Sequence, residues 1–212
     1  MQEDTSDTSD TSDISDTPDS SEDPFELLQQ ATALYKQGNL EETLDFLVRA
    51  EHSAFISRKP EALVVIYSMA GDVFSSLEDF ERSLRYFEKS LQVIKLFETD
   101  DVGDADDTGV VEDSGADLVL TEWSASNENK IGKLLFRLGQ TEDAEKRFNR
   151  ALGLYEKLLT ADPVNVQHLS SLAKVKDNMG NLLSSRGQID EACVVHTEAA
   201  DIRRSLRKGE SE

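Results

Sequence analysis

The sequence predicts an all-α solenoid of four helical hairpins with two acidic segments outside the helical body. Two observations carry this prediction: a ladder of residues that recurs four times, and two stretches whose composition differs from the rest of the chain. A recurrence on this scale is typical of stacked supersecondary units, each of which buries its apolar face only against its neighbours. The four ladders are Ala31-Gly38-Thr43-Leu47-Ala50, Gly71-Glu78-Ser83-Phe87-Ser90, Gly132-Gly139-Ala144-Phe148-Ala151 and Gly180-Gly187-Ala192-His196-Ala199.

Each ladder position has a physical role, and the order is small, glycine, small, large, small. The first small residue lies mid-helix, where a missing or short side chain lets the two helices of a hairpin approach closely. The second position follows the end of that helix, where a glycine adopts the left-handed conformation at no steric cost. Only Glu78 and His196 depart from the order. The structural glycines are Gly38, Gly71, Gly132, Gly139, Gly180 and Gly187.

Caps and breakers place the helices of the first two hairpins. The segment Asp23-Pro24-Phe25-Glu26 combines a cap, a first-turn proline and a capping acid, so the first helix is predicted from about residue 24. Asn39, with Glu42 at the third helical place, predicts a side-chain cap for the second helix. Pro60 opens the third helix, and Asp79 caps the fourth.

The same signals place four more helices, and no strand pattern appears in the sequence. The fifth helix begins near the second acidic stretch, and the sixth ends before a second Asp-Pro pair. The predicted helices are 117–138, 141–161 (or from Gln140), 163–186 and 189–206.

Two acidic segments carry most of the net charge of −21. Residues 1–24 and 98–118 each contain nine acidic residues and no Lys or Arg, which leaves 25 acids against 22 bases elsewhere. Low hydrophobicity with charge of one sign predicts disorder. The predicted organisation is therefore an acidic tail over 1–23, a helical domain over 24–207 with an acidic disordered insertion over 98–116, and a short tail over 208–212.

Several classes of protein do not fit the sequence. The start of the chain lacks the basic and apolar regions of a secretory signal, and no stretch is apolar enough to span a membrane. The lone Cys193 rules out an internal disulfide and suits a reducing cytosol, so a cytoplasmic location is expected. The negative charge disfavours nucleic acid; the basic residues at 203, 204, 207 and 208 complement a helix dipole without any partner.

No catalytic residue, cofactor or metal site is predicted. His196 occupies the ladder place of Leu47, Phe87 and Phe148, so we expect a packing role, and we expect Cys193 to be a small buried hydrophobe. The segment 104–111 matches part of a calcium loop, but Gly115 stands where a bidentate acid is required. A calcium- or metal-dependent enzyme is the alternative outside the binding proteins.

The ladder resembles the tetratricopeptide repeat over residues 25–205, and the long helices are similar to repeats of the kinesin light chain type and of prokaryotic multi-repeat proteins. The resemblance implies a right-handed solenoid whose first helices line a concave groove that contacts partners. One feature departs: the aromatic residue early in each first helix is present only as Tyr67, with Leu27, Glu128 and Lys176 in the other hairpins.

The groove helices of hairpins three and four carry amides and cations at helical spacing. Amides there could hydrogen-bond the main chain of an extended peptide, while Lys133 and Arg137 could pair carboxylates. The lysine-asparagine pattern by which such repeats clamp chaperone C-termini is absent from hairpins one and two. The predicted partner-binding residues are Asn129, Lys133, Phe136, Arg137, Lys174, Asn178 and Asn181.

The sequence therefore predicts a non-catalytic adaptor for a protein or peptide partner. The alternative among binding functions is a self-assembling scaffold, because a last hairpin without a covering helix exposes apolar surface. Val194, Val195 and Ile202 are the candidates for that surface.

Overall fold

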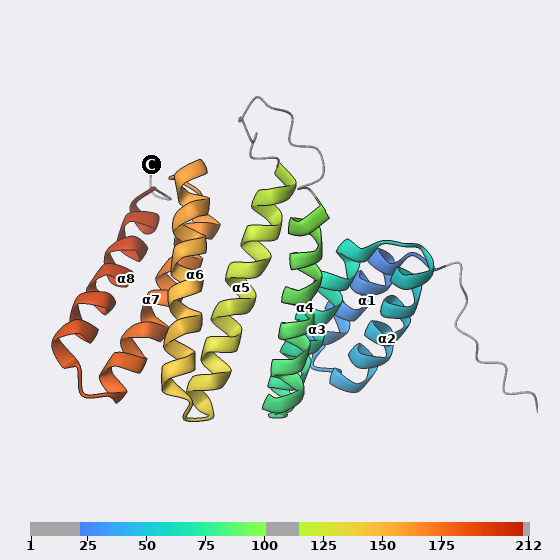
Figure 1. Ribbon diagram of the computed structural model, residues 1–212, viewed down its shortest axis with the longest axis horizontal. Helices are drawn as coiled ribbons and strands as arrows, with labels where there is room; N and C mark the ends of the chain where they lie inside the picture. The colour runs from blue at the N-terminus through green and yellow to red at the C-terminus, as the bar shows by residue number, and fades with distance from the viewer. Residues whose placement is uncertain (1–21, 101–114, 210–212) are drawn as a thin grey trace, which may run out of the picture.

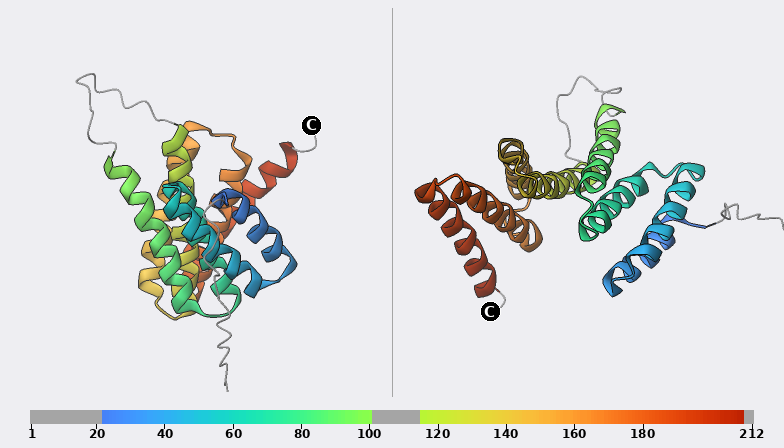
Figure 2. Two further views of the ribbon diagram at one scale, coloured as in Figure 1. Left: turned by 90° about the vertical axis from the view of Figure 1, so that its right-hand side faces the viewer. Right: turned by 90° about the horizontal axis from the view of Figure 1, so that it is seen from below.

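The computed structural model describes residues 22–100 and 115–209, which form eight α-helices and, within those ranges, no strand. Consecutive helices pair into four hairpins that stand in a row (Figures 1 and 2). This confirms the all-α solenoid. The helices are α1 Pro24–Gln37, α2 Leu40–Ile56, α3 Pro60–Ser76, α4 Phe80–Asp100, α5 Gly115–Arg137, α6 Thr141–Ala161, α7 Val166–Ser185 and α8 Ile189–Gly209.

The predicted starts of α1, α3 and α4 are confirmed. Asp23 Oδ1 accepts a hydrogen bond from the Phe25 N–H at 2.7 Å, and Asp79 Oδ1 accepts one from the Arg82 N–H at 2.9 Å. Pro60 is the first residue of α3, where a missing N–H leaves no helical hydrogen bond unmade. Local sequence is therefore sufficient to begin these helices.

One predicted cap and one predicted helix start are wrong. The side chain of Asn39 makes no capping bond; the backbone carbonyl of Asn39 instead accepts the Thr43 hydroxyl at 2.7 Å. Helix α7 begins at Val166 rather than at Pro163, because Asn165 caps it by accepting the His168 N–H at 3.0 Å. Asp162 and Pro163 form the turn that precedes this cap.

The edges of the predicted insertion over 98–116 are helical. Helix α4 runs to Asp100 and α5 begins at Gly115, because Phe97 and Leu118 still pack against the core near these ends. Residues 101–114, and residues 1–21 of the acidic tail, lie outside the described residues. The last two residues of that predicted tail are described: Glu22 pairs with Arg49, and Asp23 pairs with Lys59 at 2.5 Å.

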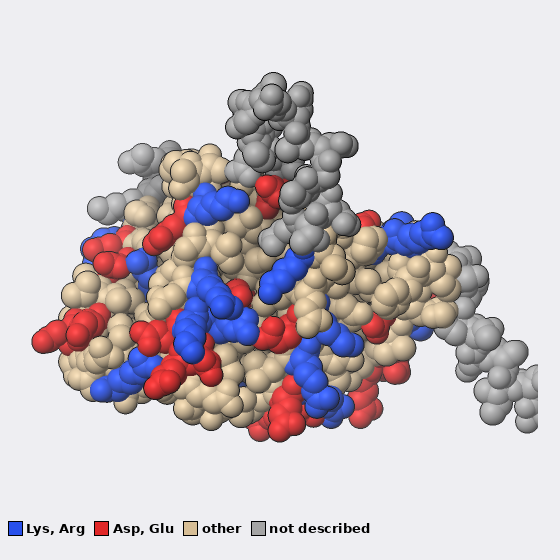
Figure 3. Space-filling view, in the orientation of Figure 1, with Lys and Arg blue, Asp and Glu red and all other residues tan. Residues whose placement is uncertain are grey.

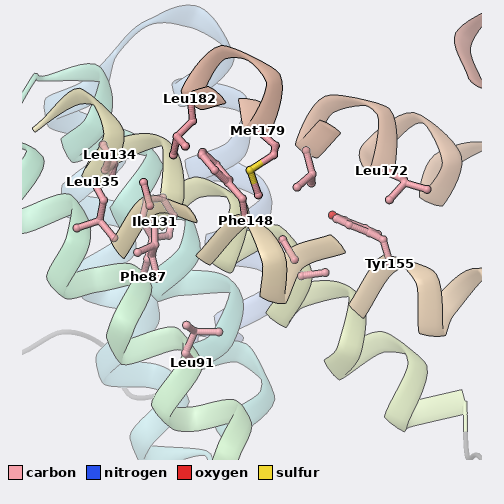
Figure 4. Packing of buried hydrophobic residues seen from close by; sticks show 14 of the residues in the cluster. Phe87, Leu91, Ile131, Leu134, Leu135, Phe148, Tyr155, Leu172, Met179 and Leu182 are labelled. Carbon is pink, nitrogen blue, oxygen red and sulfur yellow. The ribbon is translucent and has the colours of Figure 1, made fainter. Parts of the chain in front are cut away.

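The first ladder glycine does permit a close approach of two helices. A Cβ built on Gly71 would lie 2.6 Å from the Phe87 ring, and one on Gly132 would lie 2.6 Å from the Phe148 ring. A Cβ on Gly180 would lie 2.6 Å from His196 Nε2. The Phe87 and Phe148 rings thus fill the space of an absent side chain in the core (Figure 4), and the partly exposed His196 ring does so in hairpin four. His196 packs as predicted, in the place of an aromatic ring.

The second ladder position is left-handed in all four hairpins. Gly38, Gly139 and Gly187 have φ values of 83°, 76° and 77°. Glu78 holds the same conformation, with φ 59°, although a side chain makes this region sterically unfavourable. The turn geometry is therefore conserved between the hairpins even where the glycine is not.

Ion pairs replace the aromatic residue of the family pattern in hairpins three and four. Tyr67 lies under the Lys89 ammonium, 5.1 Å from the ring centroid. At the equivalent places Glu128 pairs with Arg147 at 3.0 Å and with Arg150 at 3.6 Å, and Lys176 pairs with Glu198 at 2.6 Å. In each hairpin one partner lies 22 residues later, on the second helix. The departures noted in the sequence are thus matched by compensating partners.

A chain of hydrogen bonds joins hairpins two and three. The side chain of Asn127, 1% exposed, accepts the Ser68 hydroxyl and donates to Ser90 Oγ, both at 2.8 Å. Ser90 in turn donates to the Val64 carbonyl at 2.8 Å. The interface between hairpins two and three is therefore fixed by directional bonds as well as by apolar packing.

Candidate functional site

The first helices of the hairpins line the inner side of the curved row. The backbones of α1, α3, α5 and α7 approach one another across hairpins more closely than those of the described second helices. Between second helices, Arg147 on α6 reaches Glu88 on α4 through a side-chain ion pair. Side chains bridge the inner helices: Tyr35 to Ser76 at 3.1 Å, and Asn178 Nδ2 to Asn129 Oδ1 at 2.8 Å. The row therefore curves with its first helices inside, as the right-hand view of Figure 2 shows.

An open pocket of about 240 Å³ lies in this groove between α3 and α5. Its apolar floor includes Phe87 and Leu134, both buried. The other lining residues are polar or charged: Asp72, Ser75, Lys130, Lys133 and Arg137.

The three cations of the pocket differ in their partners. Lys130 Nζ lies 2.6 Å from Asp72 Oδ2, so its charge is matched. Lys133 and Arg137 are exposed, and neither forms an ion pair with a described residue. The Arg137 guanidinium lies 5.3 Å from the centroid of the Phe80 ring. The pocket therefore presents two unmatched positive charges beside an apolar floor.

The structure brings some of the predicted groove residues together and separates others. Lys133 and Arg137 share the pocket, whereas Lys174 and Asn181 are exposed on α7. Asn129 and Asn178 bond to each other, so part of their hydrogen-bonding capacity is used between hairpins.

Phe136 and Lys130 fill roles that the sequence did not reveal. Phe136 is half-buried and packs against the core, so it is not a free groove side chain. Lys130 lines the pocket but stands outside the four-residue spacing of Asn129, Lys133 and Arg137, which is why a stripe at that spacing misses it. Lys130 and Lys133 are three residues apart, and this spacing indicates that they share one face of the helix.

The outer surface of the last hairpin is more polar than the sequence predicted. Val194 is 57% exposed, but Val195 and Ile202 pack against the core. Cys193 is exposed rather than buried, because its place corresponds to Glu145 on α6, which faces the following hairpin through Arg186 at 2.5 Å. On α8 no described helix follows.

A polar cluster lies beside the last ladder. Asp177 accepts a hydrogen bond from Arg203, and its Oδ1 lies 3.4 Å from His196 Nδ1. Burial raises the pKa of the Asp177 carboxyl, but the bonds from Arg203 and His196 outweigh it and hold the pKa below its ordinary value. Asp177 is therefore a charged anchor between α7 and α8.

Within residues 22–100 and 115–209, no group of three or more His, Cys, Asp or Glu side chains is placed to hold a metal ion. The partial calcium loop at 104–111 lies outside the described residues. None of the helices described above is long and apolar enough to cross a membrane.

Family models of the tetratricopeptide repeat match the chain at residues 64–95 and 172–207. These segments span hairpins two and four, including the ladders that contain the departures Glu78 and His196. No curated protein sequence matches the chain.

Solved structures resemble the chain in fold. BtubC (BKLC) from P. vanneervenii is 20% identical, with a TM-score of 0.60, over 84% of this chain and 61% of that one. MamA is 13% identical over 87% of this chain and 81% of that one, with a TM-score of 0.49. YrrB, titled a TPR protein with an unusual peptide-binding site, is 17% identical over 90% and 93%, with a TM-score of 0.43. The likeness to BtubC supports the repeat fold; the chain spans 61% of the length of BtubC.

Proposed function

Because the chain is built from tetratricopeptide repeats, we propose that it is a non-catalytic adaptor that holds a segment of a partner protein in its concave groove. The observation that carries the proposal is the pocket between α3 and α5, where Lys133 and Arg137 stand unmatched beside Phe87 and Leu134. Exposed Cys193 suits a reducing compartment, so we place the adaptor in the cytoplasm.

The chemistry of the pocket defines what the bound segment must supply. A carboxylate would satisfy Lys133 and Arg137 together, since these lie one helical turn apart on α5. A small apolar side chain beside that carboxylate would cover the floor. Lys174 and Asn181 on α7 would then contact the main chain or side chains of the segment further along the groove.

The test is affinity capture from native lysate with the full chain and two charge-reversal variants. Lys133→Glu with Arg137→Glu removes the unmatched charges of the groove. Lys95→Glu with Lys157→Glu is the matched control, because both lysines are exposed on second helices outside the groove. We expect the groove variant to lose a partner that the control retains; capture of the same proteins by all three chains would contradict the proposal.

A further inference from the structure

A second, wide-open pocket lies beside the turn of hairpin two and reaches Leu138 of hairpin three. The turns of these two hairpins are at the lower edge of Figure 1. We call this pocket the turn pocket. Its volume is about 620 Å³. It is lined by Leu77, Glu78, Asp79, Phe80, Glu81, Arg82 and Leu138. None of these residues lines the groove pocket, although the Phe80 ring lies under the Arg137 guanidinium of that pocket.

The apolar part of the turn pocket repeats at one ladder place. Leu77 and Leu138 both immediately precede the left-handed residue of their turn, and they are 45% and 41% exposed. The same place holds Gln37 in hairpin one and Arg186 in hairpin four. Single exposed leucines are ordinary on a protein surface, but these two lie around one pocket together with Phe80. They are the apolar side chains among polar and charged ones, and Leu138 is the contribution of hairpin three.

The rim of the pocket is negative. Asp79 Oδ2 is matched by Arg82 Nε at 2.5 Å, which leaves the exposed carboxylates of Glu78 and Glu81. Neither carboxylate forms an ion pair or hydrogen bond with a side chain in the described part of the chain. The uncompensated charge of the rim therefore faces outward.

Glu78 is retained at a steric disadvantage. It adopts φ 59° where the other three turns have glycine, and its exposed side chain contributes no bond that would offset this. Residues held in unfavourable backbone regions tend to cluster at functional sites. A glycine at this position would remove the steric cost of the left-handed conformation and would therefore make the fold more stable.

We propose that the turn pocket docks a partner segment that carries an apolar side chain beside a lysine or arginine. The apolar side chain would rest between Leu77, Phe80 and Leu138, and the cation would lie against Glu78 and Glu81. This chemistry is opposite in charge to that proposed for the groove, so the two surfaces select different segments. They meet at one contact, since the Arg137 guanidinium of the groove lies 5.3 Å from the centroid of the Phe80 ring.

The test is an NMR titration of the full chain with two peptides at low salt: acetyl-Arg-Leu-Arg-Leu-amide and acetyl-Glu-Leu-Glu-Leu-amide. We expect the basic peptide to shift the backbone amides of Leu77, Glu78 and Leu138 selectively, with the acidic peptide shifting them little. Replacing both leucines with serine should weaken the basic peptide about tenfold, as expected for the loss of apolar burial.

Two more variants complete the test. Ile189→Ser is the matched control, because Ile189 is 62% exposed and follows the glycine of hairpin four by two residues, as Phe80 follows Glu78. It should leave the affinity for the basic peptide unchanged.

Glu78→Gly should raise the melting temperature of the free chain and weaken the binding of the basic peptide about threefold, within the range of exposed ion pairs. Equal shifts by both peptides, or undiminished binding to the double serine variant, would overturn the proposal. Lys133→Glu alone, which changes a groove residue that does not line the turn pocket, should leave the affinity of the basic peptide unchanged.

Discussion

Single glycines set the distance between the two helices of a hairpin. At Gly132 an added Cβ would meet the Phe148 ring at 2.6 Å, whereas at Gly153, on the exposed side of α6, it would meet nothing within 4 Å. In hairpin one the equivalent pair is Ala31 with Leu47, a larger residue facing a smaller one. Between hairpins of this chain, a larger residue on the first helix is therefore accompanied by a smaller residue on the second.

Gly132→Ala should lower the free energy of unfolding by about 1–3 kcal/mol, because the ring must shift in a packed core. Gly153→Ala, the matched control, should raise it by up to about 1 kcal/mol through helix propensity. Adding Phe148→Leu to Gly132→Ala, which recreates the pair of hairpin one, should recover part of the loss. Urea denaturation of the four chains measures these effects, and equal effects of the two alanines would refute the packing role of the ladder.

The charge of Asp177 should make stability depend on pH. Its pKa is lowered in the folded state, since the bonds from Arg203 and His196 outweigh burial. The folded carboxylate therefore binds a proton less readily than the unfolded one. The stability that it contributes is present above the unfolded pKa, about 3.9, and is lost as the pH falls through the lower folded pKa.

Asp177→Asn should accordingly be less stable than the parent at pH 7, and the difference should narrow below about pH 4. Arg203→Gln in both chains should reduce the pH dependence of that difference, because it removes one of the bonds that favours the charged carboxylate. Urea unfolding at several pH values measures it. A difference that is constant from pH 7 to pH 3 would show that the Asp177 charge has no such role.

Within the helical elements, ion pairs take the place of an aromatic residue and reverse their polarity between hairpins. Hairpin three has the acid on its first helix, as Glu128 with Arg150, and hairpin four has the base there, as Lys176 with Glu198. Pairing the first helix of one with the second helix of the other would place like charges together, so the arrangement also opposes mispairing.

Exchanging the pair in hairpin four tests this. Lys176→Glu and Glu198→Lys should each destabilise the chain, and the double exchange should restore stability, with a coupling of about 0.5–1 kcal/mol for this partly exposed pair. The control is Asp143 with Lys146, whose side chains are 60% and 68% exposed and should couple less. Additive effects of the two exchanges in hairpin four would remove the pair as a determinant of the fold.

The sequence predicts the hairpins well because their turns, caps and close contacts depend on residues near one another in the chain. Asp23, Pro60 and Asp79 begin their helices as predicted, and the glycines mark the turns. The start of α7 was misplaced because Asp162-Pro163 and Asn165 both resemble a cap, and only the backbone geometry distinguishes them.

Contacts between hairpins are less predictable from sequence. The mutual bond of Asn129 and Asn178, and the packing of Phe136, depend on which residues a neighbouring hairpin brings close. The groove pocket was predicted only through Lys133 and Arg137; the pairing of Lys130 with Asp72, 58 residues earlier, has no local signal.

Across the whole molecule, the helical body is nearly balanced in charge while its last helix has a polar outer side. Figure 3 shows basic and acidic side chains interleaved over one face. At the places where α6 meets the following helix with Tyr155 and Leu159, α8 carries Arg203 and Arg207. A polar outer side on a terminal repeat favours solubility over stacking.

The chain should therefore be monomeric. Size-exclusion chromatography with light scattering should give the monomer mass of 23.6 kDa over a wide concentration range. Val194 is the most exposed of the three apolar residues that are candidates for a self-assembly surface, and Val194→Asp should leave that mass unchanged. If the parent chain is a dimer and Val194→Asp dissociates it, the result would favour the alternative function of a self-assembling scaffold.

The central claim is that the groove pocket binds a partner segment through its unmatched cations. The most direct measurement is calorimetric titration of the captured segment into the parent chain, into Lys133→Glu with Arg137→Glu, and into the control Lys95→Glu with Lys157→Glu. Binding to the groove variant should be weaker by about 2–5 kcal/mol, the range for removing a partner from a desolvated charge pair, and binding to the control variant should equal that of the parent. Equal affinity of all three folded chains would contradict this claim.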